Sequence, residues 1–394
     1  MEENNLIKRV INQIKDRRQR LIDGKINSIP SPFVGFKDHF IGIEQGKYYL
    51  ITSYTKGAKT QFASYTFLFN SIIYAFNNPD KIRLKIFYYP LEEKPEKIVM
   101  RFMSYLLFIL SDNKIRVSPS DLDSTDNNKP ISEDIISLLE SDEYNNLLQF
   151  FKDTIIFSTS TNPTGVYNEC TKYAKENGVI YTRKQKVKDD FGQIKEVDKF
   201  DYYVQNDAEE YKFIFVDHVS LISTEQGLNL KQSIDKLSEY CVILRNRYNF
   251  TPILIQQQAF VGENLDAFKE NKLRPTIVNL SDSKYTARDC NICIGLFSPA
   301  RYELKDYLGY DITMFKDNIR FMEILINRDG NMGGIEGLFF DGTVNYFKEL
   351  PNPNNTTSIN KIYNYLKKIR SNQLSVSFVI FSNFINKFKQ KVFK

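Results

Sequence analysis

The sequence contains little histidine and cysteine, and it lacks a long hydrophobic run. Two histidines among 394 residues are too few for a histidine-based metal site, and four cysteines in so long a chain do not form a disulfide scaffold. The longest apolar stretch, from Leu374 to Ile385, is interrupted by serine and asparagine and is too short to span a bilayer. We therefore expect a soluble, cytoplasmic protein from a reducing compartment.

Acidic residues are missing from the end of the chain. Between Leu350 and Lys394 there is no Asp or Glu, whereas eight Lys and Arg residues occur there. The preceding residues carry 45 basic and 48 acidic side chains, a net charge of −3, so this segment holds the whole positive excess. A detachable basic tail indicates an anionic partner such as a nucleic acid or a membrane surface. The alternative is the solvated end of a helix.

Short, continuously apolar segments alternate with helical patterns along the chain. Such segments are typical of strands that are buried on both faces. We expect strands at residues 48–52, 84–89, 154–158, 213–216, 253–257, 291–297 and 322–327. We expect helices at residues 61–77, 94–111, 132–140, 141–152, 164–177 and 231–249. This alternation predicts an α/β fold with a mostly parallel central sheet that helices cover on both faces.

Three segments depart from this alternation. Residues 5–23 have apolar side chains at near-helical spacing and predict an amphipathic helix that docks on its own core or on a neighbouring subunit. Residues 180–204 predict a polar β-hairpin insertion. Asp341-Gly342 predicts the turn of a closing hairpin in which residues 337–340 pair with residues 343–347. We therefore divide the chain into a docking helix and linker (1–28), a core domain with the hairpin insertion (29–350) and a basic extension (351–394).

Residues 53–60 have the form of a phosphate-binding loop. They join a predicted strand to a predicted helix and end in Lys59-Thr60. In such a loop, backbone N–H groups hold the phosphates, the lysine reaches the β- and γ-phosphates, and the threonine hydroxyl ligates Mg²⁺. In the pattern G-x-x-x-x-G-K-[ST], Ser53 and Ala58 replace both glycines, and we expect Gly57 to supply the positive φ that the loop needs. The expected nucleotide-binding residues are Ser53, Thr55, Lys56, Gly57, Ala58, Lys59 and Thr60. The alternative is an ordinary strand-to-helix turn.

Carboxylates follow two other predicted strands. Asp217 ends the apolar run 212–217, which has the form of a Walker B element, whose aspartate holds Mg²⁺. Glu92 follows the strand at 84–89, where a carboxylate could accept a proton from an attacking water, and Glu93 is its competitor. The alternatives are a helix-capping aspartate and two acids that favour the start of a helix.

Two further strand ends carry amide or guanidinium groups. Residues 256–258 are three glutamines that suit contact with a γ-phosphate, although they also fit a polar strand end that meets solvent. Arg328 follows the strand at 322–327. It could reach a phosphate bound by an adjacent subunit and act as an arginine finger, or it could be an ordinary surface arginine.

The order of these motifs resembles that of the DnaB-type replicative DNA helicases of bacteria and their phages, which are RecA-like P-loop ATPases. Tyr89-Pro-Leu-Glu92 is similar to the family's Ser-Leu-Glu element, and Phe215–Leu221 is similar to Ile-Asp-Tyr-Leu-Gln-Leu. Thr251–Gln258 resembles Val-Pro-Val-Ile-Ala-Leu-Ser-Gln, and Leu325–Gly330 resembles Lys-Gln-Arg-Asn-Gly. The resemblance covers about residues 20–350. The chain departs from the family at both glycines of the phosphate loop and at Ile326, where a second basic finger is usual.

This resemblance implies roles for the site residues. Glu92 would be the catalytic base, Gln258 the γ-phosphate sensor and Arg328 the arginine finger, with ATP as the cofactor and Mg²⁺ held by Thr60 and Asp217. The family's N-terminal primase-binding domain is not seen, which suggests a phage or mobile-element origin and hence the host cytoplasm.

The resemblance also implies an activity and partners. The chain would be an ATP hydrolase and DNA helicase, a homo-hexameric ring that translocates on single-stranded DNA and unwinds duplex DNA, with a primase or helicase loader as a further partner and no membrane. DNA contacts are expected in residues 262–284, which contain Lys269, Lys272, Arg274 and Lys284, and in residues 223–231. Two alternatives remain open: a recombinase-like or packaging ATPase on the same core, and a non-hydrolysing ring or scaffold.

Overall fold

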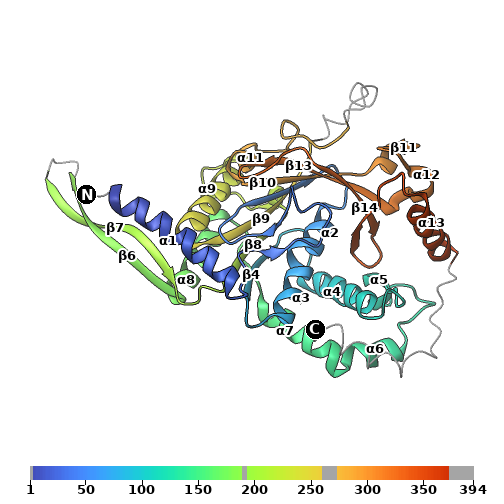
Figure 1. The fold of residues 1–394 in the computed structure, drawn as a ribbon. Helices are drawn as coiled ribbons and strands as arrows, with labels where there is room; N and C mark the ends of the chain where they lie inside the picture. The colour runs from blue at the N-terminus through green and yellow to red at the C-terminus, as the bar shows by residue number, and fades with distance from the viewer. Residues whose placement is uncertain (1–2, 189–192, 260–272, 372–394) are drawn as a thin grey trace.

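The structure, a computed structural model, describes residues 3–188, 193–259 and 273–371. Its centre is a nine-stranded sheet with the order β15-β14-β13-β10-β3-β9-β8-β4-β5 (Figure 1). These strands are β3 (Tyr49–Ser53), β4 (Arg83–Pro90), β5 (Ile155–Phe157), β8 (Glu210–Asp217), β9 (Phe250–Gln257), β10 (Ile292–Phe297), β13 (Ile319–Asn327), β14 (Ile335–Asp341) and β15 (Tyr346–Glu349). The six strands from β10 to β5 run parallel, whereas β13, β14 and β15 extend the sheet in antiparallel fashion.

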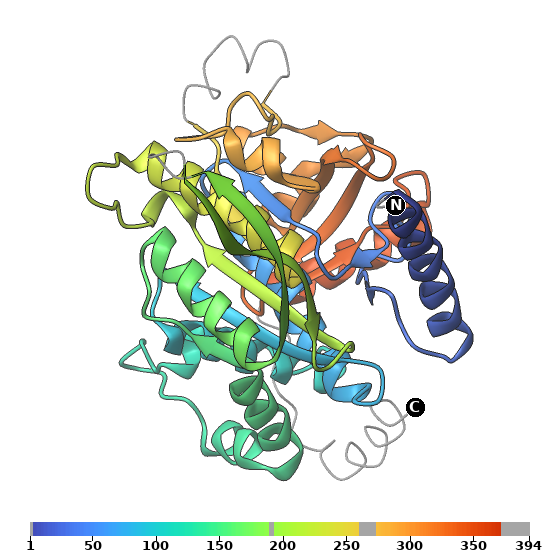
Figure 2. The ribbon, with the colours of Figure 1, turned by 90° about the vertical axis from the view of Figure 1, so that its left-hand side faces the viewer.

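Helices cover both faces of this sheet (Figures 1 and 2). The helices of the described residues are α1 (Glu3–Ile22), which projects from the body, and α2 (Lys59–Ala63), α3 (Asn70–Asn77), α4 (Pro95–Leu110), α6 (Glu133–Glu140), α7 (Asp142–Thr154), α8 (Pro163–Glu176), α9 (Leu230–Tyr248), α11 (Tyr285–Asp289) and α13 (Thr356–Arg370), besides the short ones given below. A π-helical segment, η1 (Ser64–Phe69), joins α2 to α3. The α/β fold with a mostly parallel, helix-covered sheet is thus confirmed. Among the described helices, none is both long and apolar enough to cross a membrane.

Short elements complete the fold. They are β1 (Ile29–Pro30), β2 (Gly42–Ile43), β11 (Asp306–Tyr307), β12 (Tyr310–Asp311), α5 (Pro119–Leu122), α12 (Ile312–Phe315) and the 3-10 turns η2 (Val219–Leu221), η4 (Pro299–Tyr302) and η5 (Lys316–Asn318).

The two faces of the sheet have separate cores. Phe62, Phe102 and Leu147, from α2, α4 and α7, lie in one buried cluster, and Cys170 and Leu237, from α8 and α9, lie in the other. All five residues of β3 are buried, because this strand lies in the middle of the sheet with both faces covered. This burial makes the end of β3 a rigid base for the loop that follows it.

The closing hairpin differs from its prediction in register. Phe340 pairs with Phe347 and Asp341 with Tyr346, so the turn spans the four residues 342–345 rather than Asp341-Gly342. Asn345, with a φ of 52°, lies in the left-handed region that ends this wider turn. The expectation that residues 337–340 pair with residues starting at 343 is therefore wrong, although the hairpin itself exists.

The basic extension begins as a packed helix. Ile359, Leu366 and Ile369 of α13 lie in a third buried cluster with Phe315 and Phe339. The guanidinium of Arg370 also donates to the backbone oxygens of Met314 and Phe315. A detachable tail is therefore wrong for residues 351–371, and residues 372–394 lie outside the described part of the chain.

Two elements leave the main body on one side, apart from each other (Figures 1 and 2). One is α1. It is attached to the body near its C-terminal end by ion pairs, in which Arg20 and Lys25 bind the buried carboxylate of Glu209. The other is an antiparallel hairpin of β6 (Gly178–Lys188) and β7 (Ile194–Gln205), at the place where the insertion was expected.

Candidate nucleotide-binding site

The phosphate-loop segment, residues 53–60, runs from the end of β3 to the start of α2. Lys56 and Ala58 have positive φ values, 63° and 69°, whereas Gly57 does not. A β-carbon added to Gly57 would lie 2.6 Å from the side chain of Ser53. The expectation that Gly57 supplies the positive φ is therefore wrong. Its neighbours adopt that conformation, and position 57 needs glycine because the loop folds tightly over Ser53.

The side chains of Thr60 and Asp217 contact each other next to this loop. The Thr60 hydroxyl donates to Oδ1 of Asp217 over 3.0 Å. Asp217 is only 3% exposed, and its burial, together with the negative charge of Glu92, raises its pKa to about 7. Opposing effects of Thr60, Lys59 and Arg101 are smaller. A hydroxyl beside a buried carboxylate is a pair of hard oxygen donors, so this site fits Mg²⁺.

The protein supplies few ligands for such an ion. Within the described ranges, no group of three or more His, Cys, Asp or Glu side chains is arranged to hold a metal. This matches the usual coordination of Mg²⁺ by one or two protein oxygens, with water and substrate phosphates completing the shell.

The two candidate bases, Glu92 and Glu93, make different contacts in the structure. Glu93 forms an ion pair with Arg101 of α4, with an Nη1–Oε2 distance of 2.5 Å. Glu92 instead lies beside His218, with 3.9 Å between Oε2 and Nε2, and its backbone N–H donates to the carbonyl oxygen of Asp217 over 3.2 Å. Burial, followed by the positive charge of Lys59, lowers the pKa of His218. Glu92, rather than Glu93, is therefore the acid whose negative charge raises the pKa of Asp217.

The contacts of the glutamines at the end of β9 differ from those expected. Gln258 is buried: its amide donates to Thr52 over 2.9 Å, and its carbonyl accepts from the backbone N–H of Thr276 over 3.1 Å. Gln257 instead donates to the Thr55 hydroxyl within the loop, over 2.6 Å. The sensor role of Gln258 stays a prediction, but the glutamine that contacts the loop is Gln257. Strand alternation could have separated the two, because adjacent residues point to opposite faces.

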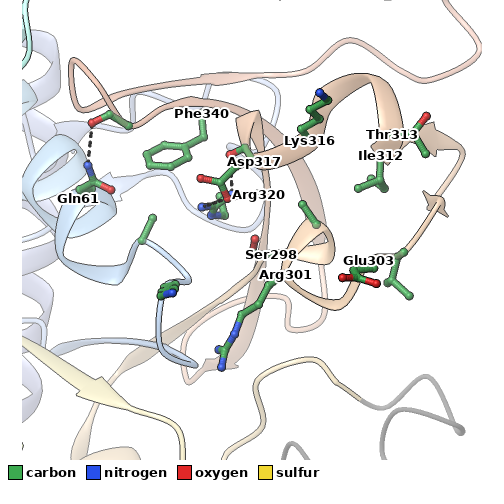
Figure 3. Close-up of a pocket in the computed structure, with 15 residues that line it drawn as sticks. Gln61, Ser298, Arg301, Glu303, Ile312, Thr313, Lys316, Asp317, Arg320 and Phe340 are labelled. Carbon is green, nitrogen blue, oxygen red and sulfur yellow. Dashed lines mark hydrogen bonds and ion pairs between the residues drawn. The ribbon is translucent and has the colours of Figure 1, made fainter.

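A cavity of about 940 Å³ adjoins the loop (Figure 3). Its volume lies within the usual range for small-molecule sites. Arg301, which the sequence did not single out, lines it and donates to the backbone oxygen of Thr55. Thr60 and Asp217 do not line this cavity, whereas Lys56 and Ala58 of the loop do. Cavity residues that carry polar groups include Lys56, Gln61, Arg301, Lys316, Asp317 and Arg320.

Several hundred chains of solved structures match this fold, and they include two helicase structures. The ATPase domain of a phage helicase matches with a TM-score of 0.59 and 14% sequence identity, over 88% of this chain and 98% of that chain. A DnaB-like replicative helicase, described with its interactions with primase, matches with a TM-score of 0.56 and 14% identity, over 87% of this chain and 66% of that chain. No family model and no curated protein matches. The chain has the fold of a DnaB-type helicase ATPase domain.

In this helicase fold, Arg328 lies far from its own phosphate loop. Asn327 pairs with Ile292 at the start of β10, and Ile292 pairs with Tyr49 at the start of β3. Arg328 therefore lies at the amino-terminal ends of β10 and β3, whereas the loop that follows Ser53 lies at the carboxyl-terminal end of β3. Its Nε donates to the backbone oxygen of Cys290 over 2.7 Å, and Nη2 donates to that of Arg288.

The expected DNA-binding segment of the helicase fold is described only in part. Lys269 and Lys272 lie outside the described residues. Arg274 forms an ion pair with Glu323, with 3.4 Å between Nη1 and Oε2, and Lys284 precedes α11. The expectation that these residues bind DNA stays a prediction.

Proposed function

We propose that the protein is an ATP-driven DNA helicase, a homo-hexameric ring that moves along single-stranded DNA and unwinds duplex DNA. The observation that carries this proposal is the convergence of Thr60, Asp217 and Glu92 at one sheet edge beside the phosphate loop. The helicase fold supports it, because the same fold belongs to the ATPase domain of a phage helicase and to a DnaB-like replicative helicase.

Each residue of the proposed site has its own role in ATP hydrolysis. Bound Mg²⁺ would neutralise charge on the β- and γ-phosphates. Thr60 and Asp217 hold that ion, Lys59 contacts the phosphates, and Glu92 accepts a proton from the attacking water. Backbone N–H groups of residues 55–60 bind phosphate oxygens, and the adjoining cavity receives the base and ribose.

The proposed ring places a nucleotide between subunits. Arg328, at the sheet edge opposite its own loop, acts on the nucleotide of a neighbour as an arginine finger. The apolar side of α1 supports assembly, because Ile7, Ile11 and Ile14 are 46–62% exposed in the single chain and need a partner surface. A primase or helicase loader is a further proposed partner.

Phosphate release from ATP, measured with and without single-stranded DNA, tests this function. We expect DNA-stimulated release that Lys59→Ala lowers about 100-fold or more, the scale of one positioned group acting on a transition state. Lys172→Ala, which removes an exposed lysine of α8, is the matched control and should retain activity.

The alternatives give different outcomes in phosphate release and in the unwinding of a forked duplex. A non-hydrolysing scaffold shows no phosphate release, and Lys59→Ala then changes nothing. A packaging or recombinase-like ATPase hydrolyses ATP but does not unwind a forked duplex. Turnover that survives Lys59→Ala contradicts the assignment of this loop.

A further inference from the structure

The phosphate loop, residues 53–60, holds two residues other than glycine in conformations that glycine adopts without strain. Lys56 and Ala58 have φ values of 63° and 69°. In this region the β-carbon crowds the backbone, so such residues keep the conformation only where the surrounding structure enforces it. Since both consensus glycines of the loop are replaced in this chain, contacts from outside the loop must hold it.

Two elements outside the loop hold Thr55, the residue before the first strained position. From η4, the guanidinium of Arg301 donates to the backbone oxygen of Thr55 (Figure 3). From the end of β9, the side-chain amide of Gln257 donates to the Thr55 hydroxyl over 2.6 Å. Both elements reach the loop because β9 and β10 flank β3, where Gln257 and Leu296 are the register partners of Ser53.

The contact from Arg301 fixes the orientation of one peptide group. The peptide between Thr55 and Lys56 is planar and trans, so its C=O and N–H point in opposite directions. Rotating this peptide by half a turn would bring the φ of Lys56 into the ordinary β region and relieve its strain. The rotation would also turn the Thr55 oxygen away from Arg301 and place it where the Lys56 N–H now lies. The charge-assisted hydrogen bond from Arg301 therefore opposes this rotation.

The same rotation would weaken phosphate binding. In the proposed function, backbone N–H groups of residues 55–60 donate to phosphate oxygens. A rotated peptide presents a carbonyl oxygen, the negative end of its dipole, in place of one of these donors. Only molecules with the unrotated peptide bind nucleotide with full affinity, so the apparent dissociation constant rises as their fraction falls.

We propose that Arg301 is a positioning residue for nucleotide binding, which holds the Thr55–Lys56 peptide in its phosphate-binding orientation and so compensates for the missing glycines. This inference rests on the proposed function, because it takes residues 53–60 as the phosphate loop. If Arg301 acts through the loop, its effect depends on the strain at position 56. A direct contact between Arg301 and the nucleotide would have the same effect whichever residue occupies position 56.

The test is a double-mutant cycle on the full chain, with the fluorescent ATP analogue N-methylanthraniloyl-ATP as the probe. Arg301→Ala should raise the dissociation constant about tenfold, the factor by which a left-handed conformation disfavours one non-glycine residue. In the Lys56→Gly background, the same substitution should raise it less than about twofold, because glycine adopts a positive φ without strain. Lys172→Ala, which removes an exposed lysine of α8, is the control.

Two further measurements separate positioning from catalysis. Arg301→Lys should lose less affinity than Arg301→Ala, because an ammonium group still donates to the Thr55 oxygen, although without the fork of a guanidinium. In phosphate release, Arg301→Ala should raise KM by the same factor as the dissociation constant. Its kcat should fall less than about threefold, since bound phosphates themselves hold the loop at saturation.

Three results would overturn the proposal. Unchanged affinity in Arg301→Ala removes the role. An equal loss of affinity in the wild-type and Lys56→Gly backgrounds shows that Arg301 contacts the nucleotide directly. A loss in kcat with unchanged affinity shows a catalytic role. A wild-type chain that binds the analogue but releases no phosphate from ATP contradicts the proposed hydrolysis and leaves the affinity cycle valid, so the two failures are distinguishable.

Discussion

At position 58, an alanine adopts a backbone conformation that glycine adopts without strain. Ala58 has a φ of 69° and a ψ of 29°, a left-handed conformation that costs a non-glycine residue about 1–2 kcal/mol. Glycine loses about 0.4–1 kcal/mol more than alanine in unfolded-chain entropy. We therefore expect Ala58→Gly to raise the free energy of unfolding by about 0.5–1 kcal/mol, the difference between these two effects, measured by denaturant melts.

The control for this prediction lies in α2, the helix that Ala58 precedes. Ala63 has a right-handed conformation, with a φ of −63°, and is fully buried. Ala63→Gly should therefore lower the free energy of unfolding by about 1 kcal/mol. Equal destabilisation by both substitutions would contradict the strain at position 58.

Lys212 is a lysine with no exposed surface. Its Nζ lies 4.9 and 5.0 Å from the ring centroids of Tyr203 and Phe250, and burial lowers its pKa to about 8. The fold therefore favours the neutral amine. Between pH 8 and about 10.5 the unfolded chain binds the proton and the folded chain does not, so this group's contribution to stability rises with pH and is unfavourable below pH 8.

Replacing this lysine by an isosteric apolar residue removes that cost. We expect Lys212→Met to raise the free energy of unfolding by about 1–3 kcal/mol at about pH 7. The difference from wild type should shrink as the pH increases towards 10.5, the usual pKa of a lysine. Thermal melts of both proteins at several pH values check this, and a gain that is independent of pH would show that packing rather than ionisation is responsible.

At the scale of the element, α1 is a helix whose apolar side chains remain exposed. Ile11→Asp/Ile14→Asp should convert the proposed hexamer into smaller species in sedimentation velocity, because charged groups cannot be buried at a subunit contact without a partner. The melting temperature of the single chain should change little, since both side chains are exposed in it. Asn12→Asp/Gln13→Asp adds the same charge to the same helix and is the control; an equal loss of assembly there would point to charge repulsion.

The positions of the strands were easier to predict than the register in which they pair. The apolar runs at 84–89 and 253–257 predict strands because few other structures bury such segments, and β4 and β9 contain them. The turn after Asp341 was misplaced because an Asp-Gly pair favours a two-residue turn, while the pairing of Phe340 with Phe347 depends on contacts outside the hairpin.

At the scale of the whole molecule, the proposed active site is shared between chains. Lys59→Ala removes the loop lysine and Arg328→Ala removes the finger from the opposite sheet edge. Each variant alone should lose about 100-fold or more in kcat. A mixture of the two should recover part of the activity, since some interfaces then combine an intact Lys59 with an intact Arg328. A mixture as inactive as its components would contradict a site in trans.

The sequence by itself determined the fold class and the residue types of the site. Alternating apolar runs and helical patterns require a covered parallel sheet, and chain order places Thr60, Glu92 and Asp217 at or just after the ends of strands. Only the tertiary structure decided which neighbours meet. Glu93 pairs with Arg101, Gln257 contacts Thr55 and Arg301 reaches the loop from η4, because these contacts depend on how the elements pack. Local sequence patterns determine the preferred backbone conformation and which residues are buried. Which of two adjacent side chains makes a given contact depends on the residues that pack against each of them.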